Sequence, residues 1–359
     1  MTKALFYDPA RTFEDNYANG PFNMDQKDYR DETVEPKFHF LGFPIQSPFG
    51  IAAGSLPTSR HTNAAFKLGY DVVVYKTQRS GEFPSNAFPN VLPIDVKGDI
   101  TLERLKKPFV VRSNFPKNLR ELSITNSFGV PSYGPSVWQD DLTHAIAGVG
   151  AGQLLIMSVV GTIREGMTPS EYYEDFALAA REAKESGAQV IEVNLSCPNV
   201  ASEGVICYSI DAVYEICKLT KEAIGDTPLV IKVGYYAPEQ QDLLERIVEK
   251  VSPYIGAISS INTLAGEIVK EDGTQALPGK GRLRSGICGA GITWAGLDMV
   301  RRLDTLRREK GYTYEIIGVG GVMSPIEFHE YRKAGANLVQ SVTGAMWNQY
   351  LAQDVKASL

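Results

Sequence analysis

The sequence predicts an α/β barrel of the TIM type, in which eight parallel strands alternate with helices. Short β-prone apolar runs alternate with amphipathic helical stretches along most of the chain, which is the pattern of a parallel sheet with crossover helices. Eight such runs can be distinguished, as the barrel requires. An open doubly wound sheet is the alternative, but the first run is not followed by the Gly-x-Gly-x-x-Gly turn typical of that fold.

The expected strands are short and mostly apolar, as strands buried on both faces are. In chain order they are Gly50–Ala53, Val72–Lys76, Leu154–Val160, Val190–Leu195, Leu229–Val233, Ala257–Asn262, Ile316–Gly320 and Leu338–Val342.

Two of the intervening helices have especially clear starts. Thr168 and Ser324 each precede a proline and stand three residues before a glutamate, which combines an N-cap hydroxyl, a proline at the first helical position and a capping box. We expect the first of these helices to extend to Gly187 and the second to Gly335, since glycine is the usual residue at a helix C-terminus.

Two segments exceed the minimal barrel. Residues 1–45 are polar, aromatic-rich and weakly periodic, so we expect an N-terminal extension laid over a barrel of residues 46–359. Residues 77–150, between the second and third strands, are too long for a simple βα connection and must carry structure of their own. Their tyrosines, prolines and serines predict the wall of a substrate pocket.

Composition and charge exclude several classes of function. The 359 residues are 43% hydrophobic and 22% charged, with no apolar stretch near the roughly 18 residues of a membrane span and no signal peptide. The four cysteines are far apart, which argues against disulfides, zinc or iron–sulfur clusters and predicts no metal and a cytoplasmic location. A net charge of −6 argues against a nucleic-acid partner.

The most informative stretch is Asn-Leu-Ser-Cys-Pro-Asn, residues 194–199, which follows directly on the fourth strand. Side-chain amides recognise the donor–acceptor edge of a planar polar ligand, and a thiol can accept a proton when it is poised as the thiolate. Cys197 alone would also fit an inert buried cysteine. The asparagines on both sides of it favour a functional site.

Residues at the ends of other strands also favour a functional site, because the active site of a TIM barrel lies at the C-terminal ends of its strands. Lys76 and Lys232 end otherwise apolar strands, where a cation is costly unless it meets an anion. The glycine turn 318–321, directly before a capped helix, would hold a phosphate group. Ala53 and Gly54 are small enough for a flat ring to approach. These features predict bound flavin mononucleotide (FMN).

The loop at residues 194–199 resembles the active-site loop of class 1 dihydroorotate dehydrogenases, which are flavin enzymes of pyrimidine biosynthesis. The resemblance extends from about Phe49 to the C-terminus. It implies an oxidoreductase that oxidises dihydroorotate to orotate and transfers a hydride to FMN, with Cys197 as the general base that takes the C5 proton. We also expect a homodimer, and no membrane partner, because residues 1–45 lack a membrane-inserting apolar face.

The resemblance further implies which positions hold each ligand. Lys232 would lie near the electron-rich N1/O2 side of the flavin and stabilise its reduced anion. Orotate is planar, with a carboxylate and alternating donors and acceptors, so amides and a cation suit it. The implied FMN positions are Ala53, Gly54, Lys76, Thr77, Asn194, Lys232, Ile261, Gly286, Gly320, Gly321 and Thr343. The implied substrate positions are Lys76, Asn126, Ser127, Phe128, Gly129, Val130, Asn194, Asn199, Asn262 and Thr263.

Three features depart from the class 1 pattern. After the active-site loop, residues 201–207 read Ala-Ser-Glu-Gly-Val-Ile-Cys, where the commonest class 1A enzymes have a Gly-Lys-Pro-Gln-like stretch. The segment after Asn262 is closer to the dihydropyrimidine dehydrogenase barrel, although that group has histidine at the position of Asn199 and typically attaches iron–sulfur domains. Val342 stands where glycine is usual. The electron acceptor therefore stays open between fumarate, a separate partner flavoprotein and a quinone.

Three other functions remain as alternatives. A dihydropyrimidine dehydrogenase would act on dihydrouracil or dihydrothymine, which lack the carboxylate that Lys76 would bind. A tRNA dihydrouridine synthase would need a basic face, which the acidic composition disfavours. A non-catalytic phosphate-binding barrel would have no use for a thiol between two asparagines.

Overall fold

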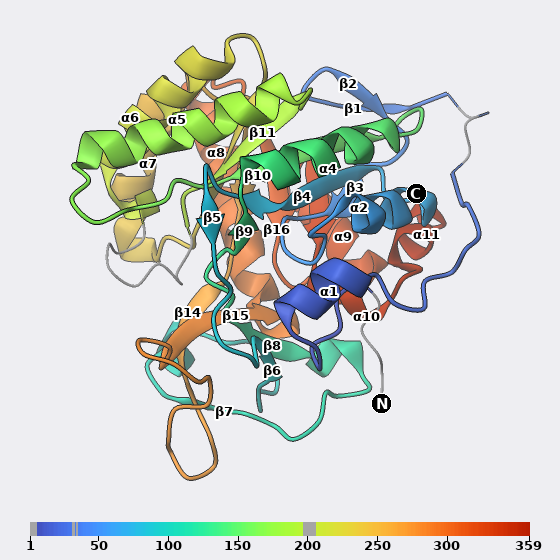
Figure 1. Ribbon diagram of the computed structural model, residues 1–359, viewed down its shortest axis with the longest axis vertical. Coiled ribbons are helices and arrows are strands. Elements are labelled where there is room, and N and C mark those ends of the chain that lie inside the picture. The colour runs from blue at the N-terminus through green and yellow to red at the C-terminus, as the bar shows by residue number, and fades with distance from the viewer. Residues whose placement is uncertain (1–5, 31–32, 34, 197–205) are drawn as a thin grey trace.

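The computed structural model describes residues 6–30, 33, 35–196 and 206–359, and its centre is a closed barrel of eight parallel strands (Figure 1). The strand order around the barrel follows the chain, from the first strand to the last and back to the first. The strands are β3 (Phe49–Ile51), β4 (Val72–Gln78), β10 (Leu154–Val159), β11 (Val190–Asn194), β12 (Leu229–Val233), β13 (Ala257–Ser260), β16 (Glu315–Val319) and β17 (Leu338–Ser341). The predicted TIM barrel is confirmed.

Each barrel strand lies at the position expected from the sequence, to within a few residues at its ends. The reason is burial on both faces: every residue of β4, β10, β11, β12, β13 and β17 is buried. One face of each strand packs inside the barrel and the other against the surrounding helices, so the strands appear in the sequence as continuous apolar runs.

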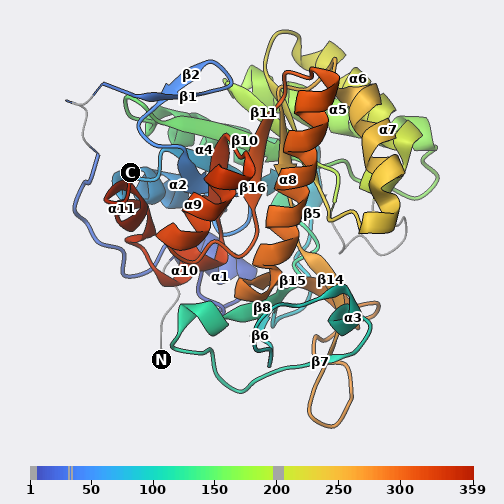
Figure 2. The ribbon, with the colours of Figure 1, turned by 180° about the vertical axis from the view of Figure 1, so that it is seen from behind.

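Helices surround the barrel, and Figure 2 shows two of them, α8 and α9, on the side hidden in Figure 1. Thr168 and Ser324 form the expected capping boxes at the starts of α5 and α9, and Gly335 caps the end of α9 in a left-handed conformation. Helix α5 ends at Glu185, just before Gly187. The helices are α2 (Ser59–Lys67), α4 (Pro135–Ala147), α5 (Pro169–Glu185), α6 (Ile210–Ile224), α7 (Gln241–Val251), α8 (Thr293–Lys310), α9 (Pro325–Ala334), α10 (Thr343–Trp347) and α11 (Leu351–Lys356).

A second, five-stranded sheet stands beside one end of the barrel, at the bottom of Figure 1. It combines strands from residues 77–150 with a hairpin that follows β13, and its strand order is β6-β8-β15-β14-β7. Both segments leave the barrel at the C-terminal end of a strand, so the sheet lies at that end. The strands are β6 (Val91–Pro93), β7 (Phe109–Val110), β8 (Ser123–Asn126), β14 (Leu264–Val269) and β15 (Arg284–Gly289).

Residues 264–289, between the sixth and seventh barrel strands, were not expected to contribute strands to a second sheet. Strand β8 pairs with β15 in antiparallel register, with Asn126 opposite Gly286. Smaller elements complete the structure. They are α3 (Leu102–Leu105), the pair β5 (Glu82–Phe83) and β9 (Ser132–Tyr133), and the single turns η1 (Leu119–Glu121), η2 (Ile206–Tyr208), η3 (Pro238–Gln240) and η4 (Ala290–Ile292).

The N-terminal residues reach both ends of the barrel. The hairpin β1 (Phe38–Phe40) and β2 (Phe43–Ile45) packs Phe40 and Ile45 against the barrel core at the N-terminal ends of the strands, and Leu41 N–H donates to the Glu315 carboxylate at the start of β16. Helix α1 (Phe13–Asn19) lies at the opposite end, beside the five-stranded sheet (Figure 1). Within the described residues, no helix has the length and apolar character needed to cross a membrane.

Candidate active site

A cavity opens at the C-terminal ends of the barrel strands, between the barrel and the five-stranded sheet. Its empty space, including a part open to solvent, is about 1120 Å³. Its wall takes residues from five barrel strands, from strands β6, β8 and β15 of the sheet, and Tyr7 from the N-terminal segment.

Most of the residues that the sequence analysis singled out line this cavity. They come from positions as far apart as residues 53 and 343, and closure of the barrel brings them together. Those in the cavity wall are Ala53, Gly54, Lys76, Thr77, Asn126, Phe128, Val130, Asn194, Lys232, Asn262, Thr263, Gly320, Gly321 and Thr343. Cys197 and Asn199 lie outside the described residues.

Four predicted residues lie behind the wall rather than in it: Ser127, Gly129, Ile261 and Gly286. Gly286 has a packing reason to be glycine, because a Cβ there would lie 2.5 Å from the hydroxyl oxygen of Thr263. Thr263 reaches the cavity wall because its neighbour has no side chain. Ile261 is fully buried in the barrel core.

Side-chain amides hold the start of the loop that contains Cys197. The amide nitrogen of Asn262 donates to the Ser196 carbonyl at 2.8 Å and to the Asn194 side-chain oxygen at 3.4 Å. The Ser196 N–H in turn donates to the Asn194 side-chain oxygen at 3.2 Å. Two strands therefore position the last described residue before Cys197.

A chain of buried polar groups runs beneath the cavity, inside the barrel. The Thr77 and Ser158 hydroxyls are 3.0 Å apart, and Ser158 donates to one carboxylate oxygen of Glu192 at 2.8 Å. The other oxygen of Glu192 is buried with no hydrogen-bond partner among the described residues. Burial lowers the pKa of Lys232, and the charge of Glu192 opposes that shift. Glu192 therefore helps Lys232, which is only 3% exposed, to keep its proton.

The predicted phosphate cradle forms a tight turn between β16 and α9. Gly320 and Gly321 have φ values of 125° and 68°, a region that residues with a Cβ rarely adopt. A Cβ on Gly321 would lie 2.0 Å from the Thr293 hydroxyl oxygen and 2.8 Å from its backbone nitrogen. Both glycines line the cavity next to the N-terminus of a ten-residue helix, which is a favourable arrangement for an anion.

Two buried arginines hold the segment 127–130 from behind. Arg282 donates from Nε to the Ser127 hydroxyl at 3.1 Å and from a terminal nitrogen to the Ser127 carbonyl at 2.9 Å. Arg79 donates to the Val130 carbonyl at 2.9 Å and to the Gly129 carbonyl at 3.2 Å. Val130 has a positive φ of 53°, which is unusual for a β-branched residue. The arginines thus fix a strained backbone that presents Asn126 and Phe128 to the cavity.

Comparison with known proteins assigns this chain to a family. A family model described as dihydroorotate dehydrogenase matches residues 113–359. A dihydroorotate dehydrogenase from Dictyostelium discoideum is 34% identical over 358 residues, covering 96% of this chain and 95% of the relative. The chain belongs to the dihydroorotate dehydrogenase family.

More distant relatives agree with this assignment. The catalytic subunit of a dihydroorotate dehydrogenase B (NAD(+)) from Methanocaldococcus jannaschii is 30% identical over 178 residues, which are 49% of this chain and 54% of that protein. The crystal structure of a DHODH from Eimeria tenella in complex with ferulenol shares the fold, with a TM-score of 0.71 at 16% identity. The match covers 96% of this chain and 87% of that one. The family and its reaction, dihydroorotate oxidation by a generally flavin-dependent enzyme, confirm the sequence-based assignment.

Several cavity residues of this dihydroorotate dehydrogenase were missed by sequence reasoning. Cys288, in β15, accepts hydrogen bonds from Asn126 at 3.4 Å and from Thr343 at 3.7 Å, and burial raises the pKa of its thiol. Nothing in the sequence pointed to Cys288, because the pairing of β15 with β8 was not anticipated. Tyr7 was missed since aromatic residues in the polar N-terminal segment show no periodic pattern.

The glycine turn yields a direct test of the cradle. In Gly321→Ala, the Cβ would displace Thr293 and strain the backbone, so we expect flavin affinity to fall by tenfold or more, on the order of 1.4 kcal/mol. Gly311→Ala is the matched control, because Gly311 has a similar φ of 71° and no atom within 4 Å of the added Cβ. Absorbance of the purified variants measures flavin per chain. Full flavin content in Gly321→Ala would argue against a cradle at this turn.

Proposed function

We propose that this chain oxidises dihydroorotate to orotate in the cavity between barrel and sheet, with FMN as its flavin and Cys197 as its general base. The observation that carries the proposal is the convergence of three amides, one lysine and a glycine turn on one cavity. Asn126, Asn194, Asn262, Lys76 and the turn at Gly320–Gly321 all line it.

The substrate is assigned to the side of the cavity formed by Lys76 and the three asparagines. Dihydroorotate carries a carboxylate, which suits the buried ammonium of Lys76, and ring amide groups that suit the side chains of Asn126, Asn194 and Asn262. Dihydrouracil presents the same ring edge without the carboxylate. Only the carboxylate of dihydroorotate adds a charge-assisted contact with the Lys76 ammonium, so Lys76 favours the acidic substrate.

The remaining features of the cavity suit FMN. The turn at Gly320–Gly321 would take the phosphate, and the buried hydroxyl of Thr263, which has no hydrogen-bond partner among the described residues, is open to a ligand group. Lys232 would face the electron-rich side of the ring and stabilise negative charge there. When bound, FMN supplies the acceptor for the hydride that leaves C6 of the substrate.

The proton at C5 is assigned to Cys197. Its loop begins at Ser196, which Asn194 and Asn262 hold by hydrogen bonds at the edge of the cavity. A thiolate at this position would remove the C5 proton as a general base. The thiol of Cys288, although it lines the same cavity, has its pKa raised by burial and accepts two hydrogen bonds, which suits packing better than proton transfer.

The proposals for the assembly and the electron acceptor rest on the resemblance, the composition and the relatives. We propose a homodimer on the class 1 resemblance alone, and a cytoplasmic location on the dispersed cysteines and acidic composition. A separate flavoprotein partner finds support in the relatives described as catalytic subunits of an NAD(+)-dependent enzyme. Fumarate and a quinone remain the other candidate acceptors.

The proposed reaction predicts a visible change in the purified protein. The protein should be yellow with bound FMN, and anaerobic dihydroorotate should bleach the flavin absorbance while dihydrouracil bleaches it poorly. The physical reason is that only dihydroorotate carries an anion for Lys76. Absorbance spectra before and after each addition make the measurement. Bleaching by dihydrouracil but not by dihydroorotate would replace this function by dihydropyrimidine oxidation.

Substitution of Cys197 tests the proposed base. Cys197→Ser keeps a small polar group but raises the pKa of the proton-accepting atom, so flavin reduction should slow by on the order of 10²–10⁴-fold near neutral pH. Its residual rate should increase with pH, whereas Cys197→Ala should be slower still and lack that increase. Stopped-flow reduction reports both, once FMN content has been checked. Near-wild-type reduction by the alanine variant would remove Cys197 from the mechanism.

The buried pair beneath the cavity predicts a shift in pH dependence. In Glu192→Gln, only burial still acts on Lys232, so its pKa falls further and the lysine loses its proton at lower pH. The alkaline limb of flavin reduction should therefore move to lower pH, while the acid limb set by Cys197 stays in place. Glu315→Gln, at the opposite end of the barrel, is the control. An unmoved alkaline limb in Glu192→Gln would mean that Lys232 does not depend on this carboxylate.

A further inference from the structure

The N-terminal segment 6–20 reaches the proposed substrate side of the cavity, although it precedes the barrel in the sequence. Tyr7 belongs to the cavity wall, and Phe13, in helix α1, is almost fully buried beside it. Both residues pack in one apolar cluster with Ile124 of β8 and Met323 and Met346 of the cavity wall. The segment is therefore part of the cavity rather than a surface appendage.

Aromatic rings of this segment interlock with rings of the insertion. Tyr7 meets Phe128 edge-on, with ring centroids 5.3 Å apart. Phe13 meets Phe128 edge-on at 6.5 Å and stacks on Tyr133 at 6.2 Å, and Tyr17 contacts Tyr133 at 4.4 Å. We call Tyr7, Phe13, Phe128 and Tyr133 the aromatic roof. It joins the N-terminal segment to the residues that border the substrate side.

The roof covers the ammonium group of Lys76. Its nitrogen lies 5.6 Å from the centre of the Phe128 ring and 6.0 Å from that of Phe13, within the range of cation–π attraction. Lys76 is only 7% exposed although it stands at the open end of the barrel. Two ring faces, one from each segment, therefore shield this cation from water.

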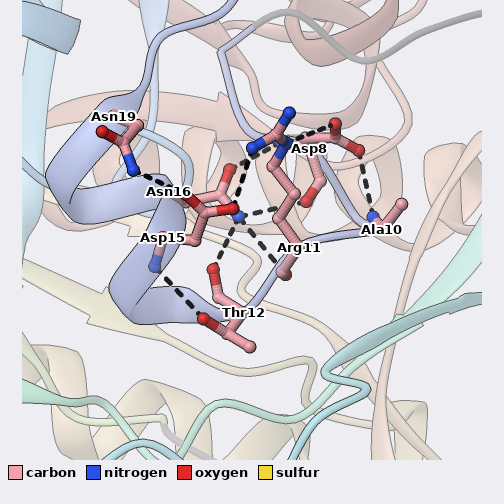
Figure 3. A network of polar contacts seen from close by, with 7 residues as sticks. All are labelled: Asp8, Ala10, Arg11, Thr12, Asp15, Asn16 and Asn19. Carbon is pink, nitrogen blue, oxygen red and sulfur yellow. Dashed lines mark hydrogen bonds and ion pairs between the residues drawn. The ribbon is translucent and has the colours of Figure 1, made fainter.

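The segment is held in place by its own hydrogen bonds, drawn in Figure 3. The buried amide of Asn16 accepts from the Asp8 N–H at 2.7 Å and donates to the carbonyls of Asp8 at 3.0 Å, Arg11 at 3.3 Å and Thr12 at 2.8 Å. The Thr12 hydroxyl caps helix α1 by accepting from the Asp15 N–H. Because this fold is fixed locally, Tyr7 is held in the cavity wall and Phe13 against Phe128 and the Lys76 ammonium.

We propose that residues 6–20 set the specificity of the enzyme for an anionic substrate, with Phe13 as the residue that keeps Lys76 out of water. A charge pair shielded from water is stronger and less screened by salt than an exposed one. The roof thus raises the affinity of Lys76 for a carboxylate. This inference rests on the proposed function of the cavity.

The test compares orotate binding in wild type and Phe13→Ala holoenzyme at low and high salt, by the change orotate causes in the flavin spectrum. Loss of the ring should weaken orotate binding roughly 3–30-fold and make it salt-dependent, whereas wild-type binding should depend little on salt. Flavin reduction by dihydroorotate should lose more than reduction by dihydrouracil, because only the anion uses Lys76. A purely structural defect would lower both alike.

Two further variants complete the design. Phe22→Ala is the matched control, because Phe22 follows the segment closely in the chain but its ring contacts Arg11, whereas the Phe13 ring lies near Lys76. Orotate binding by this variant should equal that of wild type. Phe13→Leu keeps the apolar volume without the ring, so it should weaken binding slightly and keep the low salt dependence. If Phe13→Ala folds poorly, orotate binding is measured in Phe13→Leu instead.

The outcomes separate the two proposals. Wild-type affinity, salt dependence and substrate preference in Phe13→Ala would overturn the role of the roof, while bleaching of the wild-type flavin by dihydroorotate would leave the proposed function intact. A wild-type enzyme that neither binds orotate nor is bleached by dihydroorotate would overturn the proposed function, and the roof with it.

Discussion

Two lysine ammonium groups are buried in one cavity, and the structure at the C-terminal end of the barrel depends on how their charge is accommodated. Lys76 is 7% exposed and Lys232 is 3% exposed. Burial of an uncompensated charge would be prohibitive, so each needs a partner. Lys232 has Glu192, which the Thr77–Ser158 hydroxyl chain orients from below. The Lys76 ammonium lies near the rings of Phe128 and Phe13, and Lys76 lines the cavity in which we propose that the anionic substrate binds.

The two ends of the barrel therefore serve different purposes. At the N-terminal end, the β1–β2 hairpin closes the core, and the buried carboxylate of Asp71 is satisfied by Ser47 and by Lys356 at 2.8 Å, which ties the C-terminal helix to the barrel. At the C-terminal end, the insertion and the β14–β15 hairpin form a sheet that stands apart and leaves a cavity. Stability is concentrated at one end and chemistry at the other, as is usual for this fold.

The sequence was sufficient for the barrel, which follows local rules, and for part of the cavity wall, to which the family resemblance added the segment 126–130. Strands buried on both faces are apolar runs, and residues at their C-terminal ends must meet when the barrel closes. The rest depends on contacts between distant segments. The pairing of β8 with β15 brought in Cys288, and Arg79 and Arg282 act through backbone carbonyls, which leave no sequence pattern. For the same reason Ser127 and Gly129, expected at the ligand, are held by the two arginines and do not line the cavity.

The central claim is that Lys76 and the turn at Gly320–Gly321 face the two anionic groups of the ligands in one cavity. A crystal structure of the purified protein with orotate tests it most directly. We expect the orotate carboxylate within hydrogen-bond distance of the Lys76 ammonium, and the flavin phosphate on the backbone N–H groups of Gly320 and Gly321. Orotate bound with its carboxylate away from Lys76, or a flavin phosphate held elsewhere, would contradict the account.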